Sequence, residues 1–155
     1  STAIDWFGSA ELVTASVRSL RGGADDDSVL VLQHESGVLS YLSASAVVGA
    51  PGPRVRILGT KGALVINDLD PQEALLRAGK YPENGTWTYP TTSQAFIHRG
   101  DVVDEIASIP GNYGHFYKAV ELAITSGAPW PIPNSDALLV ASIIDQAREI
   151  GTRAY

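Results

Sequence analysis

The chain has 155 residues, 45% of them hydrophobic, which is the size of one ordinary domain and enough to bury a continuous core. It contains no cysteine, which excludes a disulfide framework and a thiolate metal site and fits a reducing cytoplasm. The formal net charge is -6 and the 11 basic residues are scattered, so the sequence predicts no nucleic-acid partner. No apolar run approaches the roughly 20 residues needed to cross a bilayer, so no membrane partner is expected.

The first residues have the pattern of a helix end without its beginning. Ile4 to Phe7 resemble a last helical turn that Gly8 terminates. The chain also lacks methionine altogether and opens at Ser1. Both features predict a piece of a longer protein, with removal of an initiator methionine before Ser1 as the alternative.

Alternating apolar residues predict an antiparallel meander in the first part of the chain. The first strand places Val13, Ala15 and Val17 on one face, whereas the run Val29 to Leu32 suits a central strand covered on both faces. Strands are expected at about 12–20, 29–32, 38–47, 54–57 and 63–66, with a last hairpin at 96–98 and 102–104.

Helices are expected after the strands. A short one begins with Asp70 as N-cap and Pro71 in the first turn, and 81–93 is an irregular excursion that contains Trp87. Aromatic residues from Tyr113 to Tyr117 begin a helix whose apolar stripe is expected to be core, and Gly127 ends it. A second helix follows from Asn134 or Ser135. Strands before helices predict an α+β fold, an open, largely antiparallel β-sheet with helices packed on one face.

Several catalytic and binding motifs are absent from the sequence. There is no GxGxxG after a strand, no phosphate-binding P-loop, no GxSxG elbow and no histidine pair at metal-ligand spacing. The run Asp25 to Asp27 is interpreted as a solvated turn rather than a divalent-ion site. The chain is therefore expected to bind no metal and, by itself, no nucleotide cofactor.

A set of motifs in fixed order resembles the C-terminal domain of the Gfo/Idh/MocA oxidoreductases, the glucose-fructose oxidoreductase and inositol dehydrogenase family. The similarity runs nearly end to end and each piece is short. It comprises Ile4-Asp5-Trp6-Phe7-Gly8, the strand and turn from Arg56 to Gly62, Asp70-Pro71-Gln72-Glu73, Gly111-Asn112-Tyr113 with Phe116-Tyr117, and Gly127, Pro129 and Asp136-Ala137 before an aliphatic helix.

The resemblance implies a division of labour between two halves of an enzyme. An N-terminal Rossmann domain would bind NAD or NADP and supply a lysine, and residues 1–155 would be a single C-terminal substrate-binding and oligomerisation domain. The family histidine that handles the substrate proton would fall at Thr2, which cannot serve as a general base near neutral pH. Either Thr2 replaces a natural histidine where the chain was cut, which we favour, or this member lacks the usual base.

By the same resemblance Asp5, Trp87 and Tyr113 are the candidate substrate-site residues, with no catalytic residue retained. The expected function is the substrate-site and assembly domain of a cytoplasmic NAD(P)-dependent oxidoreductase that acts on a sugar, polyol or related hydroxy compound, inactive alone. Its expected partners are the missing Rossmann domain, a second copy in a dimer or tetramer through the sheet face, and a small sugar-like molecule. The alternative is a stand-alone dimeric binding or regulatory module without catalysis.

Overall fold

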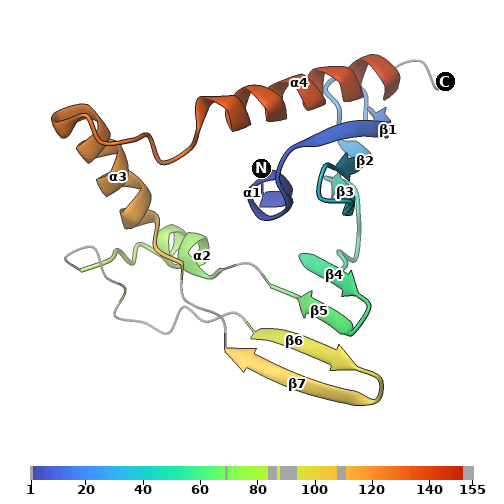
Figure 1. The fold of residues 1–155 in the computed structure, drawn as a ribbon, viewed down its shortest axis with the longest axis horizontal. Helices are drawn as coiled ribbons and strands as arrows, with labels where there is room; N and C mark the ends of the chain where they lie inside the picture. The colour runs from blue at the N-terminus through green and yellow to red at the C-terminus, as the bar shows by residue number, and fades with distance from the viewer. Residues whose placement is uncertain (1, 69, 84–86, 88–93, 108–110, 152–155) are drawn as a thin grey trace. The chain divides into compact units, whose positions relative to one another are not determined.

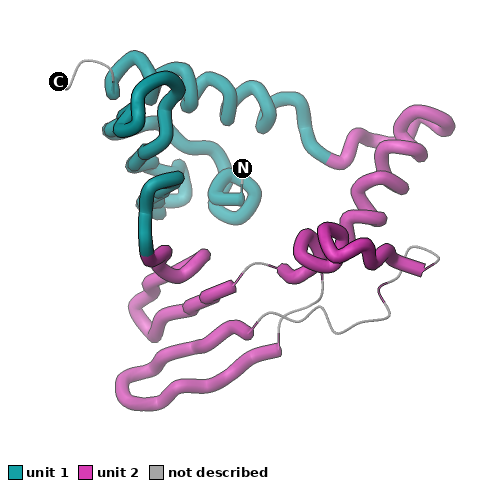
Figure 2. Tube along the Cα trace, turned by 180° about the vertical axis from the view of Figure 1, so that it is seen from behind, with its two compact units in different colours: residues 1–49, 132–155 teal, residues 50–131 magenta. Residues whose placement is uncertain are grey.

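The computed structural model describes residues 2–68, 70–83, 87, 94–107 and 111–151. These residues form two compact units, one made of residues 1–49 and 132–155 and the other of residues 50–131 (Figure 2). Every strand pairing in both units is antiparallel, which confirms the predicted α+β class. Among the described helices, none is both long and apolar enough to cross a membrane.

The first unit holds a three-stranded sheet covered by a long helix (Figure 1). Its strands follow one another in the order β1-β2-β3, with bounds Ala10–Arg18, Asp27–His34 and Leu39–Ser45. The helix α4, Asn134–Gly151, packs along β1, and the short helix α1, Thr2–Phe7, precedes the sheet. Their shared core consists of Ile4, Ala10, Leu32 and Ile143, with Leu12, Leu30, Leu139 and Val140 packed against it.

The predicted face of the first strand is wrong at Val13. The register shifts between Leu12, which pairs with Leu32, and Thr14, which pairs with Val31, so Val13 lies in an irregularity and is exposed. An extra residue in one strand reverses the alternation of faces from that point on. Leu12 therefore packs against the core in place of Val13.

The second strand is central, as predicted, but the described residues do not cover both of its faces. Leu32 is fully buried, whereas Val29 on the same strand is exposed.

The second unit holds a four-stranded sheet in the order β4-β5-β6-β7. The strands are Val55–Gly59, Gly62–Ile66, Gln94–Arg99 and Val102–Ala107, so both predicted hairpins are present. Two helices complete the unit, α2 at Gln72–Arg77 and α3 at Tyr113–Ser126. The expected excursion at 81–93 lies largely outside the described residues, which include only 81–83 and Trp87 of it.

The helix α3 corrects a second prediction. Asn112 caps it and Gly127 ends it in a left-handed conformation, as the sequence pattern indicates. However, α3 has no buried residue, and Phe116 and Tyr117 of the predicted core stripe are exposed, as is Tyr113, the residue of this stripe that is also a candidate for the substrate site. Within the described residues, the apolar surface of this helix therefore lacks the cover that a core helix has.

Gly151 provides a test of how closely α4 and β1 pack. A Cβ atom added to Gly151 would lie 2.6 Å from the backbone N and 2.7 Å from the Cβ of Val17. We expect Gly151→Ala to lower the free energy of unfolding of the first unit by about 2 kcal/mol, because the helix end must move away from the strand. Urea unfolding measures this loss, and hydrogen exchange of the backbone N–H groups of residues 10–18 locates it in β1.

Gly49→Ala is the matched control for that substitution. It lies in the same unit, and its added Cβ meets no atom within 4 Å. A loss of stability in Gly49→Ala equal to that in Gly151→Ala would show that close packing is not the cause.

Candidate substrate site

A buried glutamine connects two of the predicted substrate-site residues. The Gln72 side chain is 1% exposed. Its Oε1 atom accepts a hydrogen bond from the indole Nε1 of Trp87 at 2.8 Å and another from the backbone N of Tyr113 at 2.8 Å. One oxygen atom at the start of α2 thus fixes both an aromatic side chain of the 81–93 segment and the first residue of α3.

Asp70 makes a similar connection two residues earlier in the chain. Its Oδ1 accepts from the backbone N of Gln72 at 3.0 Å, and its Oδ2 accepts from the backbone N of Gly111 at 2.8 Å. The helix α2 begins at Gln72 with Pro71 as N-cap, one residue later than predicted, yet Asp70 still satisfies a free N–H group there. We refer to Asp70, Gln72, Trp87, Gly111 and Tyr113 as the Gln72 cluster.

Gly111 is the residue that lets the two segments of the cluster approach each other. A Cβ atom at this position would lie 2.5 Å from Nε2 of Gln72 and 2.7 Å from Oδ2 of Asp70. No side chain larger than hydrogen fits there without displacing one of these groups. The glycine in the Gly111-Asn112-Tyr113 motif is therefore explained by close packing rather than by a phosphate-binding loop.

The N-terminus of α3 offers no open donors for an anion. Its first three N–H groups, those of Tyr113, Gly114 and His115, donate to Gln72 Oε1, Asn112 Oδ1 at 2.9 Å and the Asn112 carbonyl at 3.1 Å. The Asp70 carboxylate lies beside this end of the helix and repels negative charge. The pyrophosphate of a dinucleotide would need free donors here, so these residues do not fit the cofactor.

The side chains of Tyr113 and Trp87 are nevertheless partly accessible to solvent, and therefore to a ligand. The Tyr113 side chain is 49% exposed although its backbone is held, and Trp87 is half-buried. An aromatic ring with a free edge and a phenol hydroxyl can contact the C–H face and the hydroxyl groups of a polyol. The chemistry of the cluster therefore suits a neutral hydroxylated ligand better than a phosphorylated one.

The other two residues of the predicted site lie on α1 in the first unit. Thr2 and Asp5 are both exposed and stand three residues apart, which places them on one side of the helix. Thr2 has no ionisable group, so Asp5 is the carboxylate that this helix presents.

A buried histidine holds the end of α1. His34 is 2% exposed, and its Nδ1 donates to the Gly8 carbonyl at 2.9 Å, since a carbonyl oxygen can only accept. Its Nε2 lies 2.9 Å from Ser40 Oγ, and its ring meets that of Phe7 edge to face at 5.6 Å. Ser36 Oγ also donates to the Phe7 carbonyl at 2.9 Å. The β2–β3 hairpin thus fixes the helix that carries Asp5.

Nothing in the sequence pattern singles out Gln72 or His34 as a positioning residue. Glutamine is most often exposed, and nothing in the sequence shows that this one is buried. The only available signal was its place after Asp70-Pro71, where a capped helix begins.

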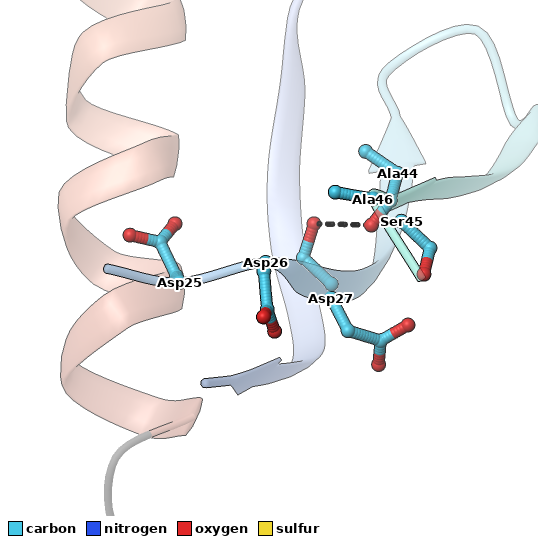
Figure 3. Close-up of a pocket in the computed structure, with 7 residues that line it drawn as sticks. Asp25, Asp26, Asp27, Ala44, Ser45 and Ala46 are labelled. Atoms are coloured by element: carbon cyan, nitrogen blue, oxygen red, sulfur yellow. Dashed lines mark hydrogen bonds between the residues drawn. The ribbon is translucent and has the colours of Figure 1, made fainter. Parts of the chain in front are cut away.

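The acidic turn surrounds a hollow of about 380 Å³ lined by residues 25–28 and 44–46 (Figure 3). Its three carboxylates point in different directions rather than toward one point. Asp26 accepts from the backbone N atoms of Leu20 at 2.7 Å and Arg21 at 3.1 Å, and Asp27 is paired with Arg18. Among the described residues, no group of three or more histidine, cysteine, aspartate or glutamate side chains is placed to hold a metal ion.

The turn predicts a pH dependence through Asp26, whose side chain is 7% exposed. The hydrogen bond from Leu20 N–H, and then that from Arg21, lowers the pKa of this carboxyl below its usual 3.8. A lowered pKa stabilises the folded state above pH 3.8, and this stability disappears as the pH falls through the folded pKa. We expect wild type to melt at a higher temperature than Asp26→Asn at neutral pH, with the difference shrinking as the pH falls below 3.8. A difference that stays constant with pH would contradict this assignment.

Comparison with known proteins identifies the family. The model for the oxidoreductase family C-terminal alpha/beta domain, GFO_IDH_MocA_C, matches residues 1–149. The chain belongs to the Gfo/Idh/MocA oxidoreductase family. Membership confirms the resemblance drawn from the ordered motifs.

Relatives of the Gfo/Idh/MocA family are about twice as long as this chain. Scyllo-inositol 2-dehydrogenase (NADP(+)) IolW of Bacillus subtilis (strain 168) is 31% identical over 149 residues, which cover 92% of this chain and 42% of the relative. The uncharacterized oxidoreductase YdgJ of Escherichia coli (strain K12) is 28% identical over 152 residues, which cover 92% of this chain and 42% of YdgJ. A solved structure from Bacteroides fragilis is 31% identical with a TM-score of 0.79, and covers 99% of this chain and 48% of the other.

Proposed function

We propose that this chain is the substrate-site and assembly domain of an NAD(P)-dependent oxidoreductase that acts on a polyol, sugar or related hydroxy compound. The observation that carries the proposal is the match of residues 1–149 to the family's C-terminal domain, while the chain spans 42% of a relative named for scyllo-inositol and NADP(+). The cytoplasm is the proposed location, since the chain has no cysteine and the named relative uses a soluble cofactor.

The cofactor belongs to a second, dinucleotide-binding domain in this proposal. The sequence has no GxGxxG, and the N–H groups at the start of α3 are occupied. The chain contributes the substrate side instead, in which Tyr113 and Trp87 of the second unit contact hydroxyl and C–H groups. Asp5, in the first unit, is a separate candidate that rests on the family resemblance alone. None of these residues needs to bind the dinucleotide.

The proposed substrate is neutral. The negatively charged Asp70 carboxylate and the closed start of α3 disfavour a phosphate or carboxylate near Tyr113. The net charge of -6 adds repulsion against an anionic ligand. The relative named for scyllo-inositol, an uncharged cyclic polyol, agrees with this choice.

The test is turnover by the protein that includes its dinucleotide-binding half. NADP+ and NAD+ reduction are measured with scyllo-inositol, myo-inositol and glucose, and with glucose 6-phosphate as the charged comparison. We expect reduction with at least one neutral compound and a lower kcat/KM with the phosphate. A purified, cofactor-binding protein that oxidises none of the neutral compounds would contradict the proposal.

Assembly is proposed through the β4–β7 sheet. Leu58 pairs with Ala63, Ala63 with His98, and His98 with Val103, so these residues form one row across the sheet. Leu58 and Val103, at the two ends of this row, are each more than half exposed. Apolar residues exposed in this way on a sheet indicate a surface that a second copy covers. Sedimentation of the wild type as a dimer or tetramer, and of Leu58→Glu/Val103→Glu as a smaller species, is the expected result. A wild-type monomer at high concentration would contradict it.

A regulatory module remains the second candidate because of one residue. Thr2 stands where the family places its proton-accepting histidine, and threonine cannot replace it. If the natural protein has threonine here and binds a polyol without turnover, the regulatory function is correct and the enzymatic one is wrong.

A further inference from the structure

We propose that Gln72 is a positioning residue of the substrate site, which holds Trp87 and Tyr113 as one unit through its single side-chain oxygen. This role rests on the proposed function, because it assigns the two aromatic residues to polyol binding. The residue itself contacts no ligand in this account. It acts only through the groups that donate to it.

The geometry makes one atom the common partner of both residues. Oε1 of Gln72 accepts the Trp87 indole N–H and the Tyr113 backbone N–H, each at 2.8 Å. A carbonyl oxygen has two lone pairs, so these two bonds use its full accepting capacity. Any displacement of the Gln72 amide therefore changes the position of both partners at once.

Burial makes this connection rigid. Gln72 is 1% exposed, so water cannot replace it as the acceptor without opening the cluster. The Gly111 segment closes one side of the amide, at a position where an added Cβ would be only 2.5 Å from Nε2. The Asp70 carboxylate accepts hydrogen bonds from the backbone N–H groups of Gln72 and Gly111, and so holds the Gln72 backbone and the Gly111 segment together.

The accessibility of the two partners shows why such a connection matters for binding. Trp87 belongs to a segment without regular structure in its described residues, and Tyr113 is half exposed at the first turn of a helix with no buried residue. Among the residues that the structure describes, neither ring belongs to the buried apolar core. A ligand that contacts both rings must order them on binding, and a preformed connection reduces that entropy cost.

The experiment compares Gln72→Leu with wild type in the protein that includes both halves. Leucine keeps similar volume but accepts no hydrogen bond. We expect the KM for scyllo-inositol to rise about tenfold while the KM for NADP+ stays within about twofold, since tenfold corresponds to the loss of roughly one buried hydrogen bond. With 5-fluorotryptophan labelling, the fluorine resonance of Trp87, assigned with Trp87→Phe, should move in Gln72→Leu.

A double-mutant cycle and a control variant isolate the positioning role. Trp87→Phe should raise the polyol KM less than Gln72→Leu does, and the double variant should be no worse than Gln72→Leu alone, because both changes remove one connection. Ala95→Gly loses a buried methyl group in β6 and should lower stability without changing either KM. The Ala95→Gly variant therefore distinguishes an effect on the position of Trp87 and Tyr113 from an effect of lower stability alone.

The outcomes distinguish this inference from the proposed function. Wild-type activity with an unchanged polyol KM in Gln72→Leu would overturn the positioning role alone, whether or not the Trp87 resonance moves. An equal rise in the KM of Ala95→Gly would also overturn it. A wild-type enzyme without polyol turnover would overturn the proposed function and this role with it.

Discussion

Replacing His34 by alanine is expected to lower the free energy of unfolding of the first unit by about 3–4 kcal/mol. The ring fills a buried position, bonds to Gly8 and Ser40, and packs against Phe7. Alanine leaves a cavity and removes the hydrogen-bond partner of the buried Ser40 hydroxyl and of the Gly8 carbonyl. Urea unfolding, with hydrogen exchange of residues 2–12 as the local readout, measures both the global loss and the release of α1.

Ser36→Ala is the matched control for His34→Ala. Ser36 also bonds to the end of α1, through the Phe7 carbonyl at 2.9 Å, but it is exposed, so water can take its place. We expect a loss of at most about 1 kcal/mol. If the two variants are equally stable, burial of the histidine is not what fixes α1, and our account of this helix is wrong.

Gly111→Ala is expected to cause a loss of about 3 kcal/mol in the second unit. The added methyl group would come within 2.7 Å of both Gln72 Nε2 and Asp70 Oδ2, so at least one of them must move. That movement breaks the bonds that hold the start of α3. Faster hydrogen exchange in 111–115 and altered Trp87 fluorescence should accompany the loss of stability.

Gly52→Ala controls for the change from glycine to alanine itself. It lies in the same unit, meets no atom within 4 Å and does not have the positive φ that glycine favours. Alanine should be neutral or stabilise slightly, by up to about 1 kcal/mol, because it restricts the unfolded chain. A loss in Gly52→Ala similar to that in Gly111→Ala would remove the evidence for close packing in the Gln72 cluster.

Local patterns in the sequence were sufficient to predict the strands and the hairpins, but not the pairing of β5 with β6 or the break of the expected five-strand meander between β3 and β4, which lie in separate sheets. Period-two alternation and short glycine-containing turns determine hairpins, because neighbouring strands pair across the turn that joins them. The prediction failed at Val13, where one additional residue in the strand reverses which side chains face the core. A bulge of this kind leaves no signature in the composition of the strand.

The candidate substrate site was only partly predictable. The family resemblance indicated Trp87 and Tyr113, but the residue that connects them, Gln72, is 15 and 41 positions away in the sequence. Such a contact depends on tertiary structure rather than on spacing. The stripe on α3 was interpreted as core because helical periodicity shows that a face is apolar without showing what covers it.

The central claim is that this chain forms the substrate side of an oxidoreductase and leaves the cofactor to another domain. A fluorescence titration of NADPH tests it most directly, with the 155-residue chain and with the protein that includes the dinucleotide-binding half. We predict saturable binding by the longer protein and only background signal with residues 1–155. Saturable binding of NADPH by the 155-residue chain alone would contradict the account.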